Sequence, residues 1–237
     1  MLALLLQTLF SEDFENDQLS KRGWYDGDRF KIVEGALEYH WKEGGTTPDS
    51  SSGIRRLFEP SETVYLRFKI KLSKGWGWSG RAYHPHLAHF MTTENGPWHG
   101  PAASRLTTYC EPQEGKLRLA LQDIQNKDAP SGLTQGPLKG GYNGTMFDSA
   151  APVFKEDTWQ VVEAFYALNA VGQADGVVRG WVDGLQVVDR TDVVLRSKDW
   201  PTMKFNQFLL TPYFGPGLLP KEQTLWIDDL SVGVKRP

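Results

Sequence analysis

Strict alternation of apolar and polar residues along residues 63–72 is the feature that most constrains this chain. Apolar side chains occupy every second position from 64 to 72, and Tyr65, Arg67, Lys69 and Lys71 stand between them. Because successive side chains of a strand point to opposite faces, one face of this segment meets a core and the other meets water. Residues 116–122 repeat the pattern, with leucine at 117, 119 and 121. The chain is therefore predicted to be built from strands with one buried face.

Short alternating runs recur along the chain, and turn residues separate them. Glu34-Gly35 and Asp183-Gly184 each stand between two runs, and such dipeptides suit the positive-φ positions of a tight hairpin. The predicted strands cover residues 9–15, 30–33, 36–41, 53–58, 63–72, 87–93, 105–111, 116–122, 159–169, 177–182, 185–188, 205–214 and 225–234. No segment has convincing helical periodicity. The sequence therefore predicts an all-β fold, a two-sheet antiparallel β-sandwich of the jelly-roll kind.

Residues 123–155 depart from this pattern. They are rich in Gly, Pro, Asn and Asp and have little alternation. A loop of that length inside a compact domain is usually functional, or else it hides an element that the pattern does not reveal. We expect either a cover over the open face of a sheet or a segment that contains undetected structure.

The chain contains no Ser/Gly-rich or charged linker in its 237 residues, so we expect a single domain over residues 10–237. Residues 1–9 read M-L-A-L-L-L-Q-T-L. They are similar to the apolar part of an export signal but lack its basic start and cleavage site, so they are read as a signal remnant or as a first strand. No other segment approaches the ~18 apolar residues of a membrane span. We expect a secreted or periplasmic protein without a membrane span.

Charge and aromatic content narrow the class of partner. A formal net charge of -3 and a pI near 6.0 provide no cationic field for a phosphate backbone, so no nucleic acid partner is expected. Nine tryptophans are more than a core of this size needs, and an indole N–H wants a partner when it is buried. Some of these rings are expected to stack on sugars. The single cysteine, Cys110, excludes an intrachain disulfide and a Cys-based zinc site.

The motifs of several enzyme classes are missing. The sequence has no phosphate-binding G-x-x-x-x-G-K-[ST], no G-x-S-x-G and no H-E-x-x-H. It also lacks the paired acids of sandwich glycoside hydrolases, E-x-D-x-x-E, which disfavours hydrolysis.

The densest polar feature is R-A-Y-H-P-H-L-A-H over residues 81–89. On a regular strand His86 and His89 point to opposite faces, so the histidines cannot converge on a metal unless Pro85 breaks the run. A single base histidine is favoured because imidazole titrates near neutral pH. A structural histidine is the alternative.

Polar and aromatic side chains alternate onto single faces of several predicted strands. They are Arg105, Thr107, Tyr109 and Glu111 on one strand, Glu163 in phase with Trp159 and Asn169, Arg179 in phase with Trp181, and Gln207 in phase with Tyr213. A glycan-binding face needs guanidinium and amide groups for hydroxyls or carboxylates and rings for sugar planes. We predict that Arg105, Glu163, Arg179, Trp181 and Gln207 gather in one hollow and bind substrate there. An ordinary solvated sheet face is the alternative.

Three segments resemble concanavalin A-like sandwich proteins, in particular polysaccharide lyases of the alginate- and glucuronan-lyase type. The first runs over residues 159–184 and contains W-Q-V-V-E at 159–163, L-N at 168–169, D-G at 175–176 and W-V-D-G at 181–184. The second is D-F-E at 13–15, and the third is W-I-D-D-L-S-V at 226–232. The resemblance covers the start and about the last third of the chain. It implies a β-elimination in which a base removes the C5 proton of a uronic acid, an acid protonates the leaving oxygen, and a further group neutralises the carboxylate.

The resemblance assigns candidates to each of these jobs. His89 or His86 is the base, Tyr213 or Tyr109 the acid, and Arg105, Arg179 or Gln207 the neutralising group. It also implies that Asp228, with Glu12 or Asp13, holds a structural calcium ion, although calcium takes six to eight oxygens. No cofactor is required for the elimination.

The leading hypothesis is a polysaccharide lyase that acts on a uronic acid-containing glycan. A non-catalytic carbohydrate-binding or lectin-like module is the rival, and a scaffold domain without a sugar site is the third reading. The expected partner is a polysaccharide or oligosaccharide, and the expected state is a monomer.

Overall fold

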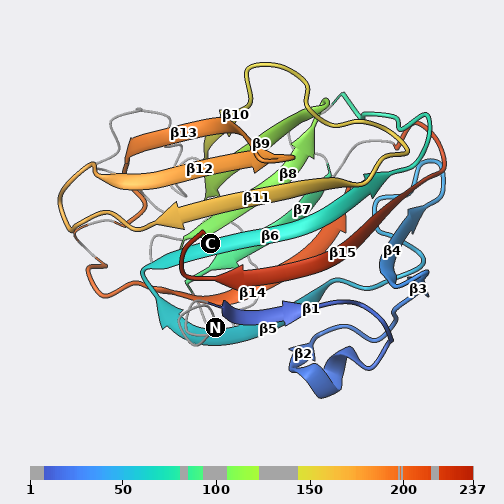
Figure 1. Cartoon of the computed structure of the whole chain (residues 1–237), viewed down its shortest axis with the longest axis horizontal. Coiled ribbons are helices and arrows are strands. Elements are labelled where there is room, and N and C mark those ends of the chain that lie inside the picture. Colours follow the sequence, from blue (N-terminus) through green and yellow to red (C-terminus); the bar gives the residue numbers. More distant parts are fainter. Residues whose placement is uncertain are drawn as a thin grey trace.

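The protein folds into two antiparallel β-sheets packed face to face, as a computed structural model shows (Figure 1). The structure describes residues 8–80, 85–92, 106–122, 144–196, 198, 200–214 and 219–236. Sheet A has the strand order β13-β12-β11-β6-β15-β4-β3, with β1 also paired to β15, and sheet B has the order β10-β9-β8-β7-β14-β5-β2. The predicted all-β sandwich is confirmed.

Sheet A consists of β1 (Thr8–Glu12), β3 (Ile32–Val33), β4 (Ala36–Trp41), β6 (Thr63–Leu72), β11 (Gln160–Ala167), β12 (Gly176–Val182), β13 (Leu185–Val193) and β15 (Gln223–Gly233). Sheet B consists of β2 (Trp24–Tyr25), β5 (Ile54–Ser61), β7 (His86–Met91), β8 (Thr107–Gln113), β9 (Lys116–Gln122), β10 (Gly144–Asp148) and β14 (Phe205–Tyr213). A short 3-10 helix, η1 (Leu19–Arg22), is the one helical element that the described residues form. None of their helices has the length and apolar character needed to cross a bilayer.

Two hairpin turns have the backbone that their sequences predict. Asp183 and Gly184 between β12 and β13 have φ values of 50° and 78°, and Glu34 and Gly35 between β3 and β4 have 52° and 76°. Positive φ at both central positions matches the right-handed twist of the paired strands, and glycine adopts it without strain. This prediction is confirmed.

The structure differs from the prediction in the ends of several strands and in two strands that were not predicted. The first strand begins at Thr8, so residues 8 and 9 belong to sheet A, whereas residues 1–7 of the proposed signal remnant lie outside the described residues. The segment 123–155 contains strand β10, which pairs with β9 through Met146 and Ala120 among other residues. Strand β2 was also not predicted, because two residues are too few to establish an alternation.

The core lies between the sheets and is filled from the inward faces. Phe90 of β7 lies within 6.2 Å of the rings of Tyr166, Phe205 and Phe208. The buried Tyr166 hydroxyl donates a hydrogen bond across the sandwich to the main-chain oxygen of Tyr109, 2.6 Å away. Aromatic rings and one directional bond therefore fix the distance between β11 and sheet B.

Candidate active site

Alternation along β7 identifies the residues on the outer face of sheet B. Phe90 points into the core, so His89 before it points away from sheet A. Its cross-strand neighbours form one row, which runs Arg55, Leu209, His89, Tyr109 across β5, β14, β7 and β8. Residues far apart in the sequence thus become neighbours on one surface.

A cavity of about 240 Å³ opens on this row. Its lining consists of Arg55, His89, Tyr109, Leu209, Thr211 and Tyr213. Three of the four predicted catalytic residues therefore line a single hollow. We call it the groove cavity.

His89 differs from the other residues of the groove cavity in that its ring is buried without a hydrogen bond from the described residues. Its side chain is 4% exposed, and neither ring nitrogen has a hydrogen-bond partner among the described residues. The ring meets that of Tyr109 edge-on at 4.5 Å. Burial, together with the neighbouring His86, lowers the pKa of His89 well below its ordinary value. The imidazole is therefore neutral at pH 7 and has a lone pair with which to accept a proton.

His86 lies beside this group, contrary to the prediction that it points to the opposite face. Its ring centroid is 4.7 Å from that of Tyr213, 5.0 Å from Tyr109 and 6.0 Å from His89. The prediction is wrong because it assumed a regular strand. The pairing of β14 with β7 shifts by one position between Leu210 and Tyr213, and His86 lies at that irregular end.

His86 is held by an acid on the neighbouring strand. Its Nδ1 lies 2.9 Å from Oε2 of Glu111, which is 1% exposed. The hydrogen bond fixes the ring orientation and makes Nδ1 the protonated nitrogen, because a carboxylate only accepts. Glu111 was predicted as part of a polar row, and its pairing with a histidine required tertiary information.

Arg55 is a cavity residue that sequence reasoning missed. Its Nε lies 3.0 Å from Oδ2 of Asp26, and its Nη1 donates to Oε1 of Gln207 at 3.1 Å. Gln207 is fully buried and supports the guanidinium. The available signal was the alternation of residues 53–58, which puts Arg55 on the face opposite Ile54.

Gln207 contacts Arg55 without lining the groove cavity, and the other predicted substrate-binding residues that the structure describes lie away from it. Glu163, Arg179 and Trp181 point outward from sheet A, because Val162, Ala164, Val178 and Val182 of the same strands fill the core. The prediction that they share a hollow with Gln207 is wrong, since alternation gives the face of a strand but not the sheet that contains it. Arg105 lies outside the described residues.

Those three residues have partners on sheet A. Glu163 binds the Tyr65 hydroxyl and, at 2.9 and 3.0 Å, the guanidinium of Arg236. The Arg236 guanidinium covers the Trp181 ring at 4.6 Å, and Arg179 pairs with Asp189 at 2.8 Å. We therefore assign them a structural role.

The predicted calcium donors do not form a suitable site. Asp228 accepts the main-chain N–H of Asp229 at 2.6 Å, and burial raises the pKa of its carboxyl group. Lys69 lies 2.8 Å from Asp229, where its ammonium opposes a second cation. Asp13 accepts from Glu15 at 3.3 Å. Within the described part of the chain, no three His, Cys, Asp or Glu residues gather for a metal. We derive no role for a metal ion here.

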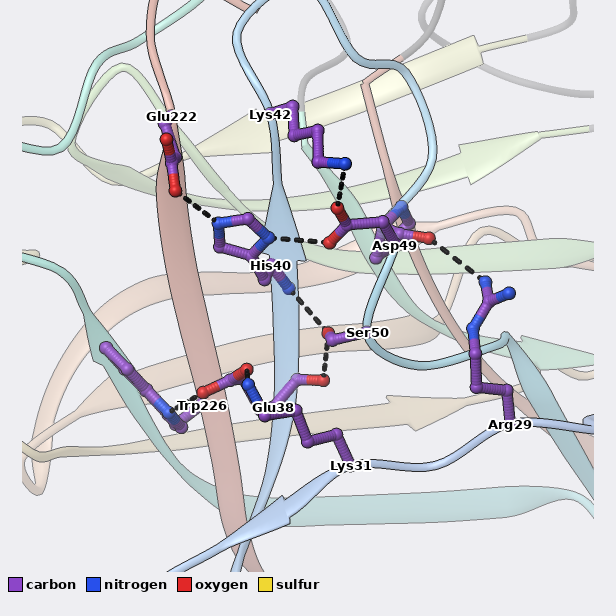
Figure 2. A network of polar contacts seen from close by, with 10 residues as sticks. Arg29, Lys31, Glu38, His40, Lys42, Asp49, Ser50, Glu222 and Trp226 are labelled. Atoms are coloured by element: carbon purple, nitrogen blue, oxygen red, sulfur yellow. Dashed lines mark hydrogen bonds and ion pairs between the residues drawn. The ribbon is translucent and has the colours of Figure 1, made fainter.

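A polar network ties the loop that follows β4 to β4 itself and to the residue before β15 (Figure 2). His40 of β4 lies between two acids, with Nδ1 2.6 Å from Asp49 and Nε2 2.9 Å from Glu222. The main-chain oxygen of Thr46 in this loop accepts the N–H of Phe214, 2.7 Å away. Because Phe214 follows Tyr213, the network supports one side of the groove cavity.

The His40 network predicts a pH-dependent stability. Hydrogen bonding to Asp49, and also to Glu222, raises the pKa of His40 above its ordinary value of 6.5. The stabilisation is complete below pH 6.5 and is lost as the pH rises through the raised pKa. We expect the urea midpoint of unfolding to fall over that window in the unmodified protein and to be flatter in His40→Gln. An equal fall in both proteins would contradict this assignment.

Comparison with known proteins gives a fold likeness and no sequence family. No protein-family model matches the chain, and no curated protein matches it. Among solved structures, an alginate lyase from Chlorella virus has a TM-score of 0.72 at 13% identity, covering 96% of this chain and 100% of that one. An endo-beta-1,4-glucuronan lyase from the fungus Trichoderma reesei has a TM-score of 0.62 at 16% identity, and the match covers 96% of both chains.

A third similar structure is the carbohydrate recognition domain of Emp46p. It has a TM-score of 0.56 at 11% identity and covers 96% of this chain and 98% of that one. At such identities the likeness establishes the fold alone. The sandwich therefore has the concanavalin A-like jelly-roll fold that the sequence resemblance implied.

Proposed function

We propose that the protein is a polysaccharide lyase that cleaves a uronic acid-containing glycan by β-elimination in the groove cavity. The observation that carries the proposal is His89, a buried and neutral imidazole without a hydrogen-bond partner among the described residues, on the wall of a cavity shared with two tyrosines. An unpaired buried imidazole costs stability, so a functional reason is expected. The fold likeness to alginate and glucuronan lyases supports the same reading.

The proposed reaction removes one proton from C5 of the uronate and adds one proton to the leaving glycosidic oxygen. His89 removes the proton from C5 of the uronate, and the electron pair of that C–H bond forms the C4–C5 double bond. The C4–O glycosidic bond breaks, and its electrons remain on the leaving oxygen. The Tyr213 hydroxyl, with Tyr109 as the alternative donor, protonates that oxygen. The products are a reducing end and an unsaturated uronate, without water or a metal in the balance.

Binding of the substrate is expected to make His89 a stronger base. A uronate carboxylate bound beside His89 favours the protonated imidazole and so raises a pKa that burial has lowered. Arg55, held by Asp26 and Gln207, is the cation of the cavity wall that can pair with this carboxylate. We infer that Arg55 neutralises the carboxylate, a role for which the sequence favoured Arg105, Arg179 or Gln207.

A binding-only function is the second candidate. The likeness to the Emp46p structure favours it, because that fold neighbour is a carbohydrate recognition domain. The same cavity would then recognise a sugar without turnover. Both functions imply a glycan partner, and a secreted or periplasmic location, where a protein meets polysaccharides, is part of the proposal.

A substrate panel distinguishes these functions. We expect sodium alginate, polyglucuronate or another polyuronate to give a rise in ultraviolet absorbance from the new conjugated double bond, and a neutral β-glucan to give none. Heat-denatured protein is the control for contaminating absorbance. Retention on an immobilised polyuronate with no absorbance rise on any polymer would replace the lyase by the binding module.

A further inference from the structure

A second aromatic surface lies on the outer face of sheet A, on the other side of the sandwich from the groove cavity. Trp226 of β15 pairs with Glu38 of β4 on one side and with Lys71 of β6 on the other. Trp159 stands just before β11, and the register of β11 with β6 brings it beside Lys71. The four side chains therefore form one cross-strand row. We call Trp226, Lys71 and Trp159 the tryptophan platform.

Lys71 has a different environment from the other cations of this face. Its ammonium lies 4.7 Å from the ring centroid of Trp226 and 5.3 Å from that of Trp159, and it has no carboxylate partner among the described residues. The neighbouring cations are paired. These pairs are Lys31 with Glu38, Lys69 with Asp229, Arg179 with Asp189 and Arg236 with Glu163, at 2.7 to 2.9 Å. The platform thus holds a positive charge that no carboxylate of the described segments pairs with.

The Trp226 ring is fixed before any ligand arrives. Its Nε1 donates to Oε2 of Glu38 at 3.2 Å, and Glu38 is held in turn by Lys31 at 2.7 Å, as Figure 2 shows. Ser50 Oγ donates to the main-chain oxygen of the same glutamate. A ring whose rotamer is set loses little conformational entropy on binding.

Trp159 provides the accessible part of the platform. It is 40% exposed, one of four large hydrophobic side chains that are exposed among the described residues. An indole that is both exposed and next to an ammonium group offers a flat apolar surface on which a sugar C–H face can stack. The adjacent ammonium then pairs with an anionic group on the same ligand.

We propose that the tryptophan platform is a second binding site for an acidic polysaccharide. A uronate ring stacks on Trp159, and its carboxylate pairs with Lys71. The site rests on the proposed function only for the class of polymer, and it needs no residue of the groove cavity. Its role is to hold the polymer at the protein surface, where a second contact increases the overall affinity for long chains.

Native electrophoresis in gels that contain sodium alginate tests this proposal. The His89→Ala protein is used as the parent, so that cleavage does not consume the polymer. We expect Trp159→Ala to bind alginate about tenfold more weakly, as loss of one stacked ring and its buried area implies. Lys71→Met keeps most of the side-chain stem and is expected to weaken binding to alginate but not to neutral β-glucan.

Trp200→Ala is the matched control, because Trp200 is 43% exposed but lies outside the row. It is expected to migrate like the parent. Unchanged migration of Trp159→Ala in the alginate gel would overturn the proposal. Weaker alginate binding in Lys71→Met with unchanged binding in Trp159→Ala would also overturn it, because that result indicates general charge attraction. The outcome is separate from that of the proposed function, because a protein that binds through the platform but makes no unsaturated product still shows the Trp159 dependence.

Discussion

Replacing His89 with alanine is expected to abolish the formation of unsaturated product, with a fall in turnover of about 10²–10⁴-fold. The imidazole is neutral and carries no hydrogen bond from the described residues, so its removal takes away the proposed proton acceptor and little else. The unfolding free energy is expected to change little. The lost contacts are offset because two buried nitrogens without partners are removed as well. Turnover of a polyuronate and the urea midpoint, measured on the same protein, check both expectations.

Met91→Leu is the matched control for this variant. Met91 lies two residues along β7 on the same face and is fully buried, so the substitution tests repacking of the face without removing a titratable group. We expect near-normal turnover. Full activity in His89→Ala, or an equal loss in both variants, would refute the assignment of His89 as the base.

Replacing Phe90 with alanine is expected to lower the unfolding free energy by about 3–5 kcal/mol. This residue directly follows His89, but its side chain points between the sheets and is 1% exposed. Its ring contacts Phe58, Tyr166, Phe205 and Phe208, so truncation leaves a cavity that rigid neighbouring rings cannot fill. Urea unfolding followed by tryptophan fluorescence measures the loss.

Phe90→Leu is the control and is expected to cost less than about 1.5 kcal/mol, because most of the buried volume is kept. Together, the substitutions at positions 89 and 90 test the side-chain alternation of β7. One is expected to remove activity with little change in stability, and the other to remove stability. A stability loss below about 1 kcal/mol in Phe90→Ala would place its ring outside the core.

The groove cavity shows where sequence reasoning succeeds and where it ends. Alternation correctly placed Tyr109 and Glu111 on one face of their strand, and the histidine-rich run was correctly singled out as unusual. Alternation failed at His86, where the register of β14 against β7 shifts, since a period of two holds only along a regular strand. Alternation gives the face on which Arg55 lies but not its place in the cavity, because its partner Gln207 is 152 residues away in the sequence.

The residues Glu163, Arg179 and Trp181 show a second limit. Their phase within each strand was correct, because they do point away from the core. Their strands, however, belong to sheet A, whereas those of Tyr109, Gln207 and Tyr213 belong to sheet B. The two outer faces of a sandwich carry the same alternating signal, so the sequence pattern does not separate a groove on one sheet from a platform on the other.

By itself the sequence determined that the chain forms strands with one apolar face, that particular dipeptides close its hairpins, and that the protein is an antiparallel sandwich. These features depend on the steric period of an extended chain and on backbone freedom at a few turn residues, both of which are local. The tertiary structure alone decided that His86, His89, Tyr109 and Tyr213 meet while Glu163 and Arg179 lie on the opposite side. That outcome depends on strand pairing and register between distant segments, which are fixed by packing of the whole core.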